Sequence, residues 1–560
     1  MSKHIKYIIN MFTVHIKDRD YTEWHLINES TSLNVSPLTN KLFHGDILDP
    51  SGQLIASPYK EKTDICGVLL TSEKTYGRDG SGNKLLYKCV PDDEHLPCFL
   101  IPYEEKQIGF NKVKTNHYIT FRIKEWLATK HPLGLVTNTF GPVNESEAYI
   151  AYQICCKNLN ASLKNLNAMC LRRLRENTLG PIPTYCDEKA IEDRRAERII
   201  SIDPAGCNDI DDAIGIRTTS NGETILSIYI SNVPMMLEYL HLWPYLTERV
   251  ATIYLPQTKF PMLPSALSEN MCSLKEKEVR VAFVLDITWK CMTIQSINYT
   301  STIIRVEKNY AYNSAELLCR TDYKEMLEIV KELNDSVRYL DKISNSHDLV
   351  EYCMIFMNME CAKELERKKC GIFRSAMKKE TLTENNPYPS DLKHVLQCAA
   401  GEYCSFENRK PHELIGNGLD TYINVTSPIR RIVDIINMTI LLKEQVEWSA
   451  DASDFLEKWQ TEMIPMINTK TKAIRKLQNE MELLQTYEKQ PNRTYTGILF
   501  NRTEINTKAQ YKYNVYITET KMLTTVRIHE EFNNFTTKYF SAHLFLDEAK
   551  MTKKIRLQLL

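Results

Sequence analysis

Four aspartates lie within ten residues of one another, in the segment IISIDPAGCNDIDDAIGI. They are Asp203, Asp209, Asp211 and Asp212. Two like charges about 4 Å apart repel each other by about 4 kcal/mol at an effective dielectric near 20, so carboxylates between isoleucine-rich stretches would take up protons unless a divalent cation neutralised them. Ligands that are all oxygen favour Mg²⁺ or Mn²⁺ over Zn²⁺, and such ions keep positions free for water and a substrate phosphate. Phosphoryl-transfer enzymes use ions held in this way.

Two other interpretations compete with a magnesium site. A polar turn with solvated acids is common in Asp-rich loops. A calcium loop of the EF-hand type is excluded, because the fifth and sixth positions counted from Asp209 are Ala213 and Ile214 rather than Asp/Asn and Gly. From the cluster alone, the metal site and the solvated turn both stay open.

Three further blocks follow the acidic segment in order. They are ATIYLPQTKFPMLPSALSENMCSLKEKEVRVAF at 251–283, HDLVEYCMIFMNMECAKELERK from His347 and YINVTSPIRRIVDII from Tyr422. With DPAGCNDIDDAI, these blocks resemble the ribonuclease II/R family, and within it most the eukaryotic exosome-type 3′→5′ exoribonuclease. Several ordered blocks are much harder to obtain by chance than one.

The resemblance implies a role for each singled-out residue. It makes the four aspartates the metal-site carboxylates, and Asp211 the one whose loss should harm the chemistry most. Arg430, in SPIRR, would lie on the phosphate next to the scissile bond, where a guanidinium offers fork-shaped donors. Tyr254, in TIYLPQ, would stack on the terminal nucleotide. The structural alternatives are a surface salt bridge for Arg430, a pairing of Arg431 with Asp434, and a core or strand-end position for Tyr254.

The implied activity is magnesium-dependent hydrolysis of single-stranded RNA from its 3′ end to nucleoside 5′-monophosphates, with Mn²⁺ as the second candidate ion. An exosome-like complex is the candidate protein partner. The exosome-type enzymes also carry an N-terminal endonuclease domain, which we do not expect in this chain because too few residues precede its barrels.

Four positions depart from the family pattern. The family usually has HIADVS where this chain has YISNVP, which places Tyr229 and Asn232 at a His and an Asp. It commonly has a His-Arg pair where this chain has Asn437 and Met438. These departures motivate the alternative hypothesis, a catalytically inactive RNA-binding or scaffold protein of the same fold.

Composition limits the class of protein and the kinds of site that the chain can contain. A chain of 560 residues with 43% hydrophobic and 25% charged content is ordinary for a globular protein of three or four domains, and no stretch is apolar enough for a membrane span. Its 16 cysteines include no CxxC pair, so a zinc ribbon is not supported and reduced thiols in an intracellular compartment, cytoplasmic or nuclear, are expected. Because the net charge is only −1, an RNA site must be a local basic channel.

The elements that must position these residues form an α+β protein. Strand character is clear at 226–233 and 279–289, and helical spacing at 321–343, 347–369 and 452–488. The resemblance implies an RNB catalytic domain with two cold-shock-like OB barrels before it and an OB-type RNA-binding barrel after it. The expected boundaries are 1–65 and 66–150 for the two barrels, 151–195 for a connecting helix and linker, 196–488 for the catalytic domain and 489–560 for the last barrel.

The C-terminal segment leans toward RNA binding by composition. Residues 486–560 hold twelve Lys/Arg against seven Asp/Glu, interleaved with aromatic side chains: Tyr495, Phe500, Tyr511, Tyr513 and Tyr516. Basic charge beside aromatics suits a surface that follows phosphates and stacks bases. An ordinary barrel core with a solvated basic face explains the composition equally well.

Overall fold

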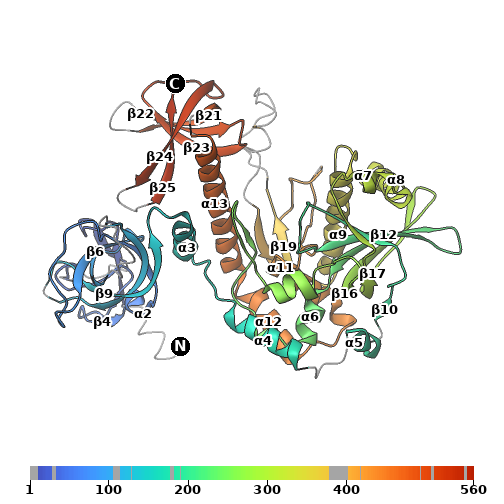
Figure 1. The fold of residues 1–560 in the computed structure, drawn as a ribbon, viewed down its shortest axis with the longest axis horizontal. Coiled ribbons are helices and arrows are strands. Elements are labelled where there is room, and N and C mark those ends of the chain that lie inside the picture. The colour runs from blue at the N-terminus through green and yellow to red at the C-terminus, as the bar shows by residue number, and fades with distance from the viewer. Residues whose placement is uncertain are drawn as a thin grey trace. The chain divides into compact units, whose positions relative to one another are not determined.

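The computed structural model describes residues 11–27, 33, 35–104, 114–127, 129–176, 182–189, 191–377, 392, 401–416, 418–491, 493–505, 510–547 and 552–560. The chain divides into two compact units (Figure 1). The first unit consists of Met1–Asn160, Leu483–Glu531 and Thr537–Leu560. The second consists of Ala161–Glu482 and Phe532–Thr536.

The first unit begins with two small β-structures. The first is a four-stranded sheet in the order β2-β1-β3-β4, built from β1 (Phe12–Ile16), β2 (Trp24–Ile27), β3 (Ile47–Leu48) and β4 (Leu54–Ala56). Alternate residues of β1 are buried, as the two-residue period of a strand requires. After α2 (Pro58–Glu61), a closed barrel in the order β5-β6-β7-β9-β8 is formed by β5 (Ile65–Leu69), β6 (Leu85–Pro91), β7 (Phe99–Tyr103), β8 (His117–Glu125) and β9 (Leu133–Pro142).

The C-terminal part of the first unit is a five-stranded antiparallel sheet in the order β23-β22-β21-β24-β25. Its strands are β21 (Thr494–Ile505), β22 (Gln510–Ile517), β23 (Met522–Ile528), β24 (Thr537–Asp547) and β25 (Thr552–Leu559). Of the five aromatics singled out in this segment, four are at most 2% exposed: Tyr495, Phe500, Tyr513 and Tyr516. The core explanation therefore holds for these four side chains, and base stacking by them was the wrong alternative.

The second unit is built on a seven-stranded sheet in the order β10-β17-β16-β13-β12-β11-β18. Only β10 with β17 and β11 with β18 run parallel. Asp203 ends one strand and Asp212 begins the next, so a single loop joins the two carboxylates. The strands are β10 (Glu192–Asp193), β11 (Ile199–Asp203), β12 (Asp212–Thr218), β13 (Thr224–Ser231), β16 (Val279–Lys290), β17 (Thr293–Arg305) and β18 (Lys308–Ala311).

Helices, one short hairpin and a second pair of antiparallel strands complete the second unit, and α8 (Thr321–Ser336) and α9 (Ser346–Arg367) pack against each other (Figure 1). A one-turn π-helix, η2 (Ala266–Met271), follows the hairpin of β14 (Ile253–Tyr254) and β15 (Lys259–Phe260). The other elements are α4 (Lys164–Arg175), α5 (Ile182–Glu188), α6 (Val233–Tyr239), η1 (Trp243–Tyr245), α7 (Ala315–Cys319), α8 (Thr321–Ser336), α9 (Ser346–Arg367), β19 (Ile372–Ser375), β20 (Glu402–Ser405), η3 (Phe406–Asn408), α11 (Ile432–Leu441), η4 (Leu442–Glu444) and α12 (Ala450–Thr461).

Three expected helical segments differ from the structure. The single helix expected at 452–488 is two helices, α12 and α13 (Ile464–Lys489), because Pro465 has no backbone N–H for a preceding turn and is tolerated only near a helix start. The helix expected to reach residue 343 ends at Ser336, where the Asn334 side chain accepts hydrogen bonds from Tyr339 N and Leu340 N. The linker region holds α4 and α5 and the end of α3 (Ser146–Cys156).

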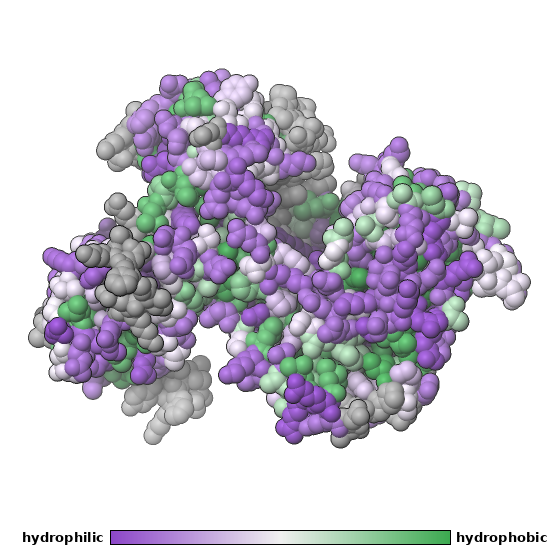
Figure 2. Space-filling model, in the orientation of Figure 1, coloured by the Kyte–Doolittle hydropathy of each residue, from purple (hydrophilic) through white to green (hydrophobic). Residues whose placement is uncertain are grey.

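Among the described residues, no helix is long and apolar enough to cross a membrane. Hydrophilic residues cover most of the face seen in the space-filling view (Figure 2). The cysteines among the described residues are free thiols.

Candidate active site at the β11–β12 loop

Asp211 is the most deeply buried of the four aspartates, with 4% of its surface exposed. Its Oδ1 accepts a hydrogen bond from Ile429 N at 2.9 Å, and its Oδ2 accepts one from Arg430 Nε at 3.1 Å. Burial raises the pKa of Asp211 to about 7 even though Arg430 acts in the opposite direction. The acidic loop and the SPIRR segment therefore meet at this carboxylate.

Asp209 faces the β14–β15 hairpin. Its Oδ2 accepts a hydrogen bond from Tyr254 Oη at 3.1 Å, and its Oδ1 lies 3.2 Å from Lys259 Nζ. Tyr254 and Lys259 are paired across the hairpin, so one small element presents both donors. Both oxygens of Asp209 are thus occupied by protein donors.

Asp203 and Asp212 have no such cationic partner among their recorded contacts. Burial, followed by the charge of Asp209, raises the pKa of Asp203 to about 6, although a hydrogen bond from Ser201 opposes the shift. Burial and the charges of Asp203 and Asp211 raise the pKa of Asp212 well above its usual value. Oδ2 of Asp203 is buried and accepts no hydrogen bond. This pair of carboxylates has no cation among its direct contacts, although the charge of Arg430 opposes the pKa shift of both.

The four aspartates lie in one region, but they do not converge on a single point. Within the described part of the chain, no group of three or more His, Cys, Asp or Glu side chains is arranged to hold a metal ion. The contacts explain this arrangement, because Asp209 is turned toward Lys259 and Asp211 toward Arg430. Oxygen donors suited to Mg²⁺ or Mn²⁺ are present, and Asp203 and Asp212 are the two that make no recorded ion pair.

A cavity of about 330 Å³ lies beside the carboxylates. No Asp or Glu is among the described residues that line it, whereas several cationic and aromatic side chains are: Tyr254, Arg374, Tyr403, Arg430, Arg431 and Arg475. The Arg374 guanidinium stacks over the Tyr403 ring at 4.8 Å. Burial, together with the charge of Arg374, lowers the pKa of Arg475. A cavity of this charge favours an anionic ligand.

Backbone hydrogen bonds hold the arginines and the hairpin together. Thr252 N donates to Arg430 O at 3.0 Å, and Ile432 N donates to Val250 O at 2.9 Å. Tyr254 is therefore fixed two residues beyond a segment that is bonded to Arg430. Both side chains keep access to solvent, with 44% of the Arg430 side chain and 40% of Tyr254 exposed.

The second arginine of SPIRR is a structural residue. Arg431 Nη2 lies 2.9 Å from Oδ1 of Asp434, which is fully buried at the start of α11. The pairing expected as an alternative for Arg431 is therefore present. The surface salt bridge considered for Arg430 is replaced by a contact with Asp211.

Sequence reasoning missed several residues of this site. Lys259, Arg374 and Arg475 were not singled out, and neither was a ring pair formed by Tyr312 and His347, whose centroids are 3.7 Å apart at 11°. Tyr312 N donates to Asp203 O at 3.1 Å, so the stacked rings border the acidic loop. Burial and the charges of Asp212 and Asp203 raise the pKa of Tyr312 to about 12. Position within the YLPQTK block was the available signal for Lys259.

Tyr229, the first departure from the family pattern, lies on the other face of the sheet from Asp212. It is opposite Ala213, the neighbour of Asp212 on β12, and successive strand residues point to opposite faces. Its hydroxyl donates to Glu197 at 2.7 Å. Tyr229 thus belongs to a polar network away from the acidic loop.

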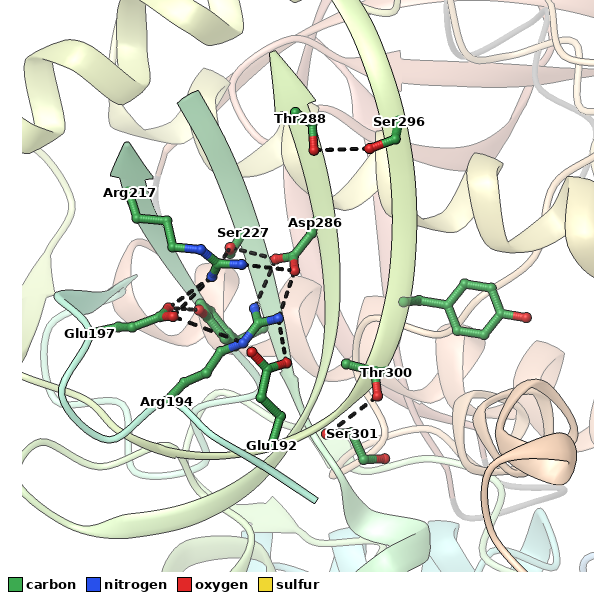
Figure 3. Close-up of polar contacts among 12 residues, drawn as sticks. Glu192, Arg194, Glu197, Arg217, Ser227, Asp286, Thr288, Ser296, Thr300 and Ser301 are labelled. Carbon is green, nitrogen blue, oxygen red and sulfur yellow. Dashed lines mark hydrogen bonds and ion pairs between the residues drawn. The ribbon is translucent and has the colours of Figure 1, made fainter. Parts of the chain in front are cut away.

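That network ties together β12, β13 and β16 (Figure 3). Arg194 contacts Asp286 through two hydrogen bonds of 2.9 and 2.7 Å, and Ser227 Oγ donates to the same carboxylate at 2.6 Å. Arg217 on β12 joins Glu197 at 3.0 Å. Because β12 begins at Asp212, the network fixes the strand that carries one of the site carboxylates.

The other three departures are also structural positions. Asn232 caps α6 by accepting from Met235 N, and its amide donates to Ser301 Oγ at 3.0 Å. Asn437 is fully buried, where it accepts from Ile372 N and donates to Ile372 O, each at 2.9 Å. Met438 is buried beside it in α11. None of these side chains contacts an aspartate of the acidic loop among its recorded hydrogen bonds.

Comparison with known proteins identifies the domain that contains the acidic loop. The family model of the RNB domain matches residues 191–346. Ribonuclease R of Aquifex aeolicus (strain VF5) is 25% identical over 289 residues, which cover 49% of this chain. The match spans 38% of the length of that relative.

Two solved structures share the fold over nearly the whole chain. The apo form of Mycoplasma genitalium RNase R matches with a TM-score of 0.68 and 15% identity, covering 98% of this chain and 100% of that one. Yeast Ssd1, a pseudonuclease, matches with a TM-score of 0.59 and 12% identity, covering 97% and 82%. The expected α+β architecture, an RNB domain flanked by small OB-type β-structures, is confirmed. Residues 191–346 form an RNB domain, and the expected resemblance to the ribonuclease II/R family is confirmed.

Proposed function

We propose that the chain is a divalent-metal-dependent, hydrolytic 3′→5′ exoribonuclease that degrades single-stranded RNA to nucleoside 5′-monophosphates. One observation carries the proposal: the acidic loop lies beside a cavity whose described lining includes four arginines and no carboxylate. Negative charge on one side suits a cation, and positive charge on the other suits the phosphates of a polynucleotide. The names of the relatives point to the same chemistry.

Asp203, Asp209, Asp211 and Asp212 are the residues that would hold Mg²⁺ or Mn²⁺. The buried Oδ2 of Asp203, which accepts no hydrogen bond, supports this assignment, and so does the repulsion between Asp203 and Asp212. When bound, the ion supplies an activated water and neutralises charge on the attacked phosphate.

The remaining roles belong to side chains that face the cavity. Arg430 contacts the phosphate beside the scissile bond through its planar guanidinium, which stays charged at any working pH. Tyr254 stacks on the terminal base, an interaction that tolerates every base and so suits a general degrader. Arg374 and Arg475 follow the phosphates of the incoming strand. RNA is the proposed polynucleotide, and an exosome-like complex is the proposed partner.

The second candidate is a catalytically inactive RNA-binding or scaffold protein. The likeness to a pseudonuclease fold favours it, as do the four departures from the family pattern. Two observations support the enzyme instead. All four aspartates and Arg430 are present, and the departing residues have hydrogen bonds or core positions of their own.

A degradation assay separates the two candidates. Purified protein is incubated with a 5′-labelled single-stranded RNA over a range of Mg²⁺ and Mn²⁺ concentrations, and the products are identified by mass spectrometry. We expect progressive shortening with release of 5′-monophosphates. Binding of the RNA without any mononucleotide product would establish the scaffold instead.

Asp211→Asn is the decisive variant. It keeps the shape that accepts the Ile429 N–H but removes the charge, so we expect degradation to stop while RNA affinity stays within about twofold. Asp193→Asn is the matched control, because Asp193 is exposed and pairs only with nearby Arg195 in its recorded contacts. Degradation by Asp211→Asn at the wild-type rate would overturn the proposal.

A further inference from the structure

Lys259 brings a positive charge to Asp209, an aspartate that would itself hold a cation. Its Nζ lies 3.2 Å from Oδ1 of Asp209 and 3.0 Å from Oε1 of Glu269. The pairs are partly buried, with 29% of the lysine side chain, 11% of Asp209 and 32% of Glu269 exposed. Such ion pairs are less screened by solvent than surface pairs.

The β14–β15 hairpin supplies two donors to Asp209, and Lys259 is one of them. Tyr254 and Lys259 are partners across β14 and β15, and each donates to a different oxygen of Asp209. A carboxylate with both oxygens engaged has to release at least one donor before it can bind a cation. Tyr254 and Lys259 therefore compete directly with a divalent ion for Asp209.

Glu269 lowers the free-energy cost of separating Lys259 from Asp209. It is placed on η2, where its carboxylate already contacts the ammonium. When Asp209 turns away, Lys259 keeps one anionic partner and is not left as an isolated partly buried charge. A lysine that was held by Asp209 alone would resist the exchange much more strongly.

We propose that Lys259 is an internal counter-cation that competes with the divalent ion for Asp209 and so sets the affinity of the site, with Glu269 as its alternative partner. This inference rests on the proposed function, because it requires the acidic loop to be the metal site. It predicts that the metal requirement of this chain is tuned by a residue that contacts neither the RNA nor the ion.

Metal binding without RNA tests the inference. The full chain is stripped of metal with a chelator, and Mn²⁺ is titrated while free Mn²⁺ is measured by electron paramagnetic resonance. Lys259→Met removes the charge at similar side-chain length, and we expect Mn²⁺ to bind at least about fivefold more tightly, within the usual range for coupled sites. Glu269→Gln leaves Lys259 with Asp209 as its anionic partner, and we expect weaker Mn²⁺ binding.

Mn²⁺ affinity is expected to rise in Lys259→Met and to fall in Glu269→Gln. Unfolding would lower it in both variants, so the two results distinguish the proposed competition from a loss of structure. Lys331→Met is the control for net charge, because Lys331 forms an exposed pair with Glu328 on α8; its Mn²⁺ affinity should equal that of the wild type. If Lys259→Met binds Mn²⁺ no more tightly than the wild type does, the inference is overturned and the proposed function still stands. Absence of Mn²⁺ binding in both the wild type and Lys259→Met would overturn the metal site itself.

Discussion

Arg430 Nε lies 3.1 Å from Oδ2 of Asp211, although 219 positions separate the two residues in the chain. The same carboxylate accepts the Ile429 N–H, so Asp211 is held by consecutive residues of one segment. A metal-site carboxylate and a phosphate-binding guanidinium would need this proximity, because both act on one phosphodiester. The pair is the structural link between the acidic loop and the SPIRR segment.

Replacement of Arg430 by lysine tests whether its shape matters. Arg430→Lys keeps the charge but loses the planar fork, and we expect kcat for RNA degradation to fall by about 10²-fold, as for the loss of one fixed transition-state donor. Rates with a labelled oligonucleotide at saturating Mg²⁺ give the answer. Arg195→Lys, in an exposed pair, should match the wild type. A lysine variant with the wild-type kcat would show that Arg430 supplies only charge.

Tyr254 separates stacking from hydrogen bonding. Tyr254→Ala removes the ring, and we expect RNA affinity to fall by about 1–3 kcal/mol, the range for one base stacked on an aromatic side chain. Tyr254→Phe keeps the ring and loses only the bond to Asp209, so its affinity should stay within about twofold of the wild type. Fluorescence anisotropy with a short RNA measures both. Equal losses in the two variants would exclude a stacking role.

The buried network around Asp286 should stabilise the second unit. Asp286→Ala leaves the Arg194 guanidinium, which is 4% exposed, without its main carboxylate. We expect roughly 3 kcal/mol of lost stability, the lower end for a broken buried ion pair, because Glu192 still contacts Arg194. Urea unfolding followed by tryptophan fluorescence measures this. Asp193→Ala, in the exposed pair with Arg195, should change the stability by less than about 1 kcal/mol.

Two histidines in the first unit, His15 and His44, predict sensitivity to acid. The His15 ring lies 4.6 Å from that of His25 and 4.8 Å from that of His44, and His44 lies 4.4 Å from His95. Burial, with the charges of neighbouring histidines, lowers the pKa of His15 and of His44. Lys17 adds to the shift of His15, whereas Asp93 and a backbone hydrogen bond with Ile16 oppose that of His44.

The sign of the effect follows from proton binding. An unfolded chain takes up protons on His15 and His44 below about pH 6.5, whereas the folded chain resists them, so stability falls as the pH drops below that value. We expect the melting temperature of the first unit to fall between pH 7.5 and 5.5. His15→Phe keeps an aromatic ring and removes one titrating group, so the shift should shrink. An identical shift in that variant would rule out His15 as a contributor.

Much of the site could be predicted from short motifs, because Asp203, Asp211, Arg430 and Tyr254 each belong to a segment with a recognisable pattern. The structure brings these segments together as the motifs suggest. Arg374 and Arg475 could not be found in this way, since they come from β19 and α13 and meet only through packing. The contact of Lys259 with Asp209 likewise depends on the register of a two-residue hairpin.

The fold shows a similar division. Strands β13 and β16 follow runs of β-branched residues that the sequence marks clearly, and Pro465 could have indicated the helix break. Composition left open whether the C-terminal aromatics stack on bases or fill a core, because it does not tell which face of a strand a ring occupies. Tyr513 and Tyr516 are separated by three positions, yet both side chains are buried.

The π-helical turn at Ala266–Met271 gives the chain an unusual dependence on length. Its wide spacing accommodates one residue more than an α-helical turn, and Glu269 lies within it. Deleting one residue there would restore regular spacing and rotate the following side chains by about 100° around the axis. Under the proposed competition between Lys259 and the ion, a deletion at this turn would therefore change the cation dependence of this chain without altering a single aspartate.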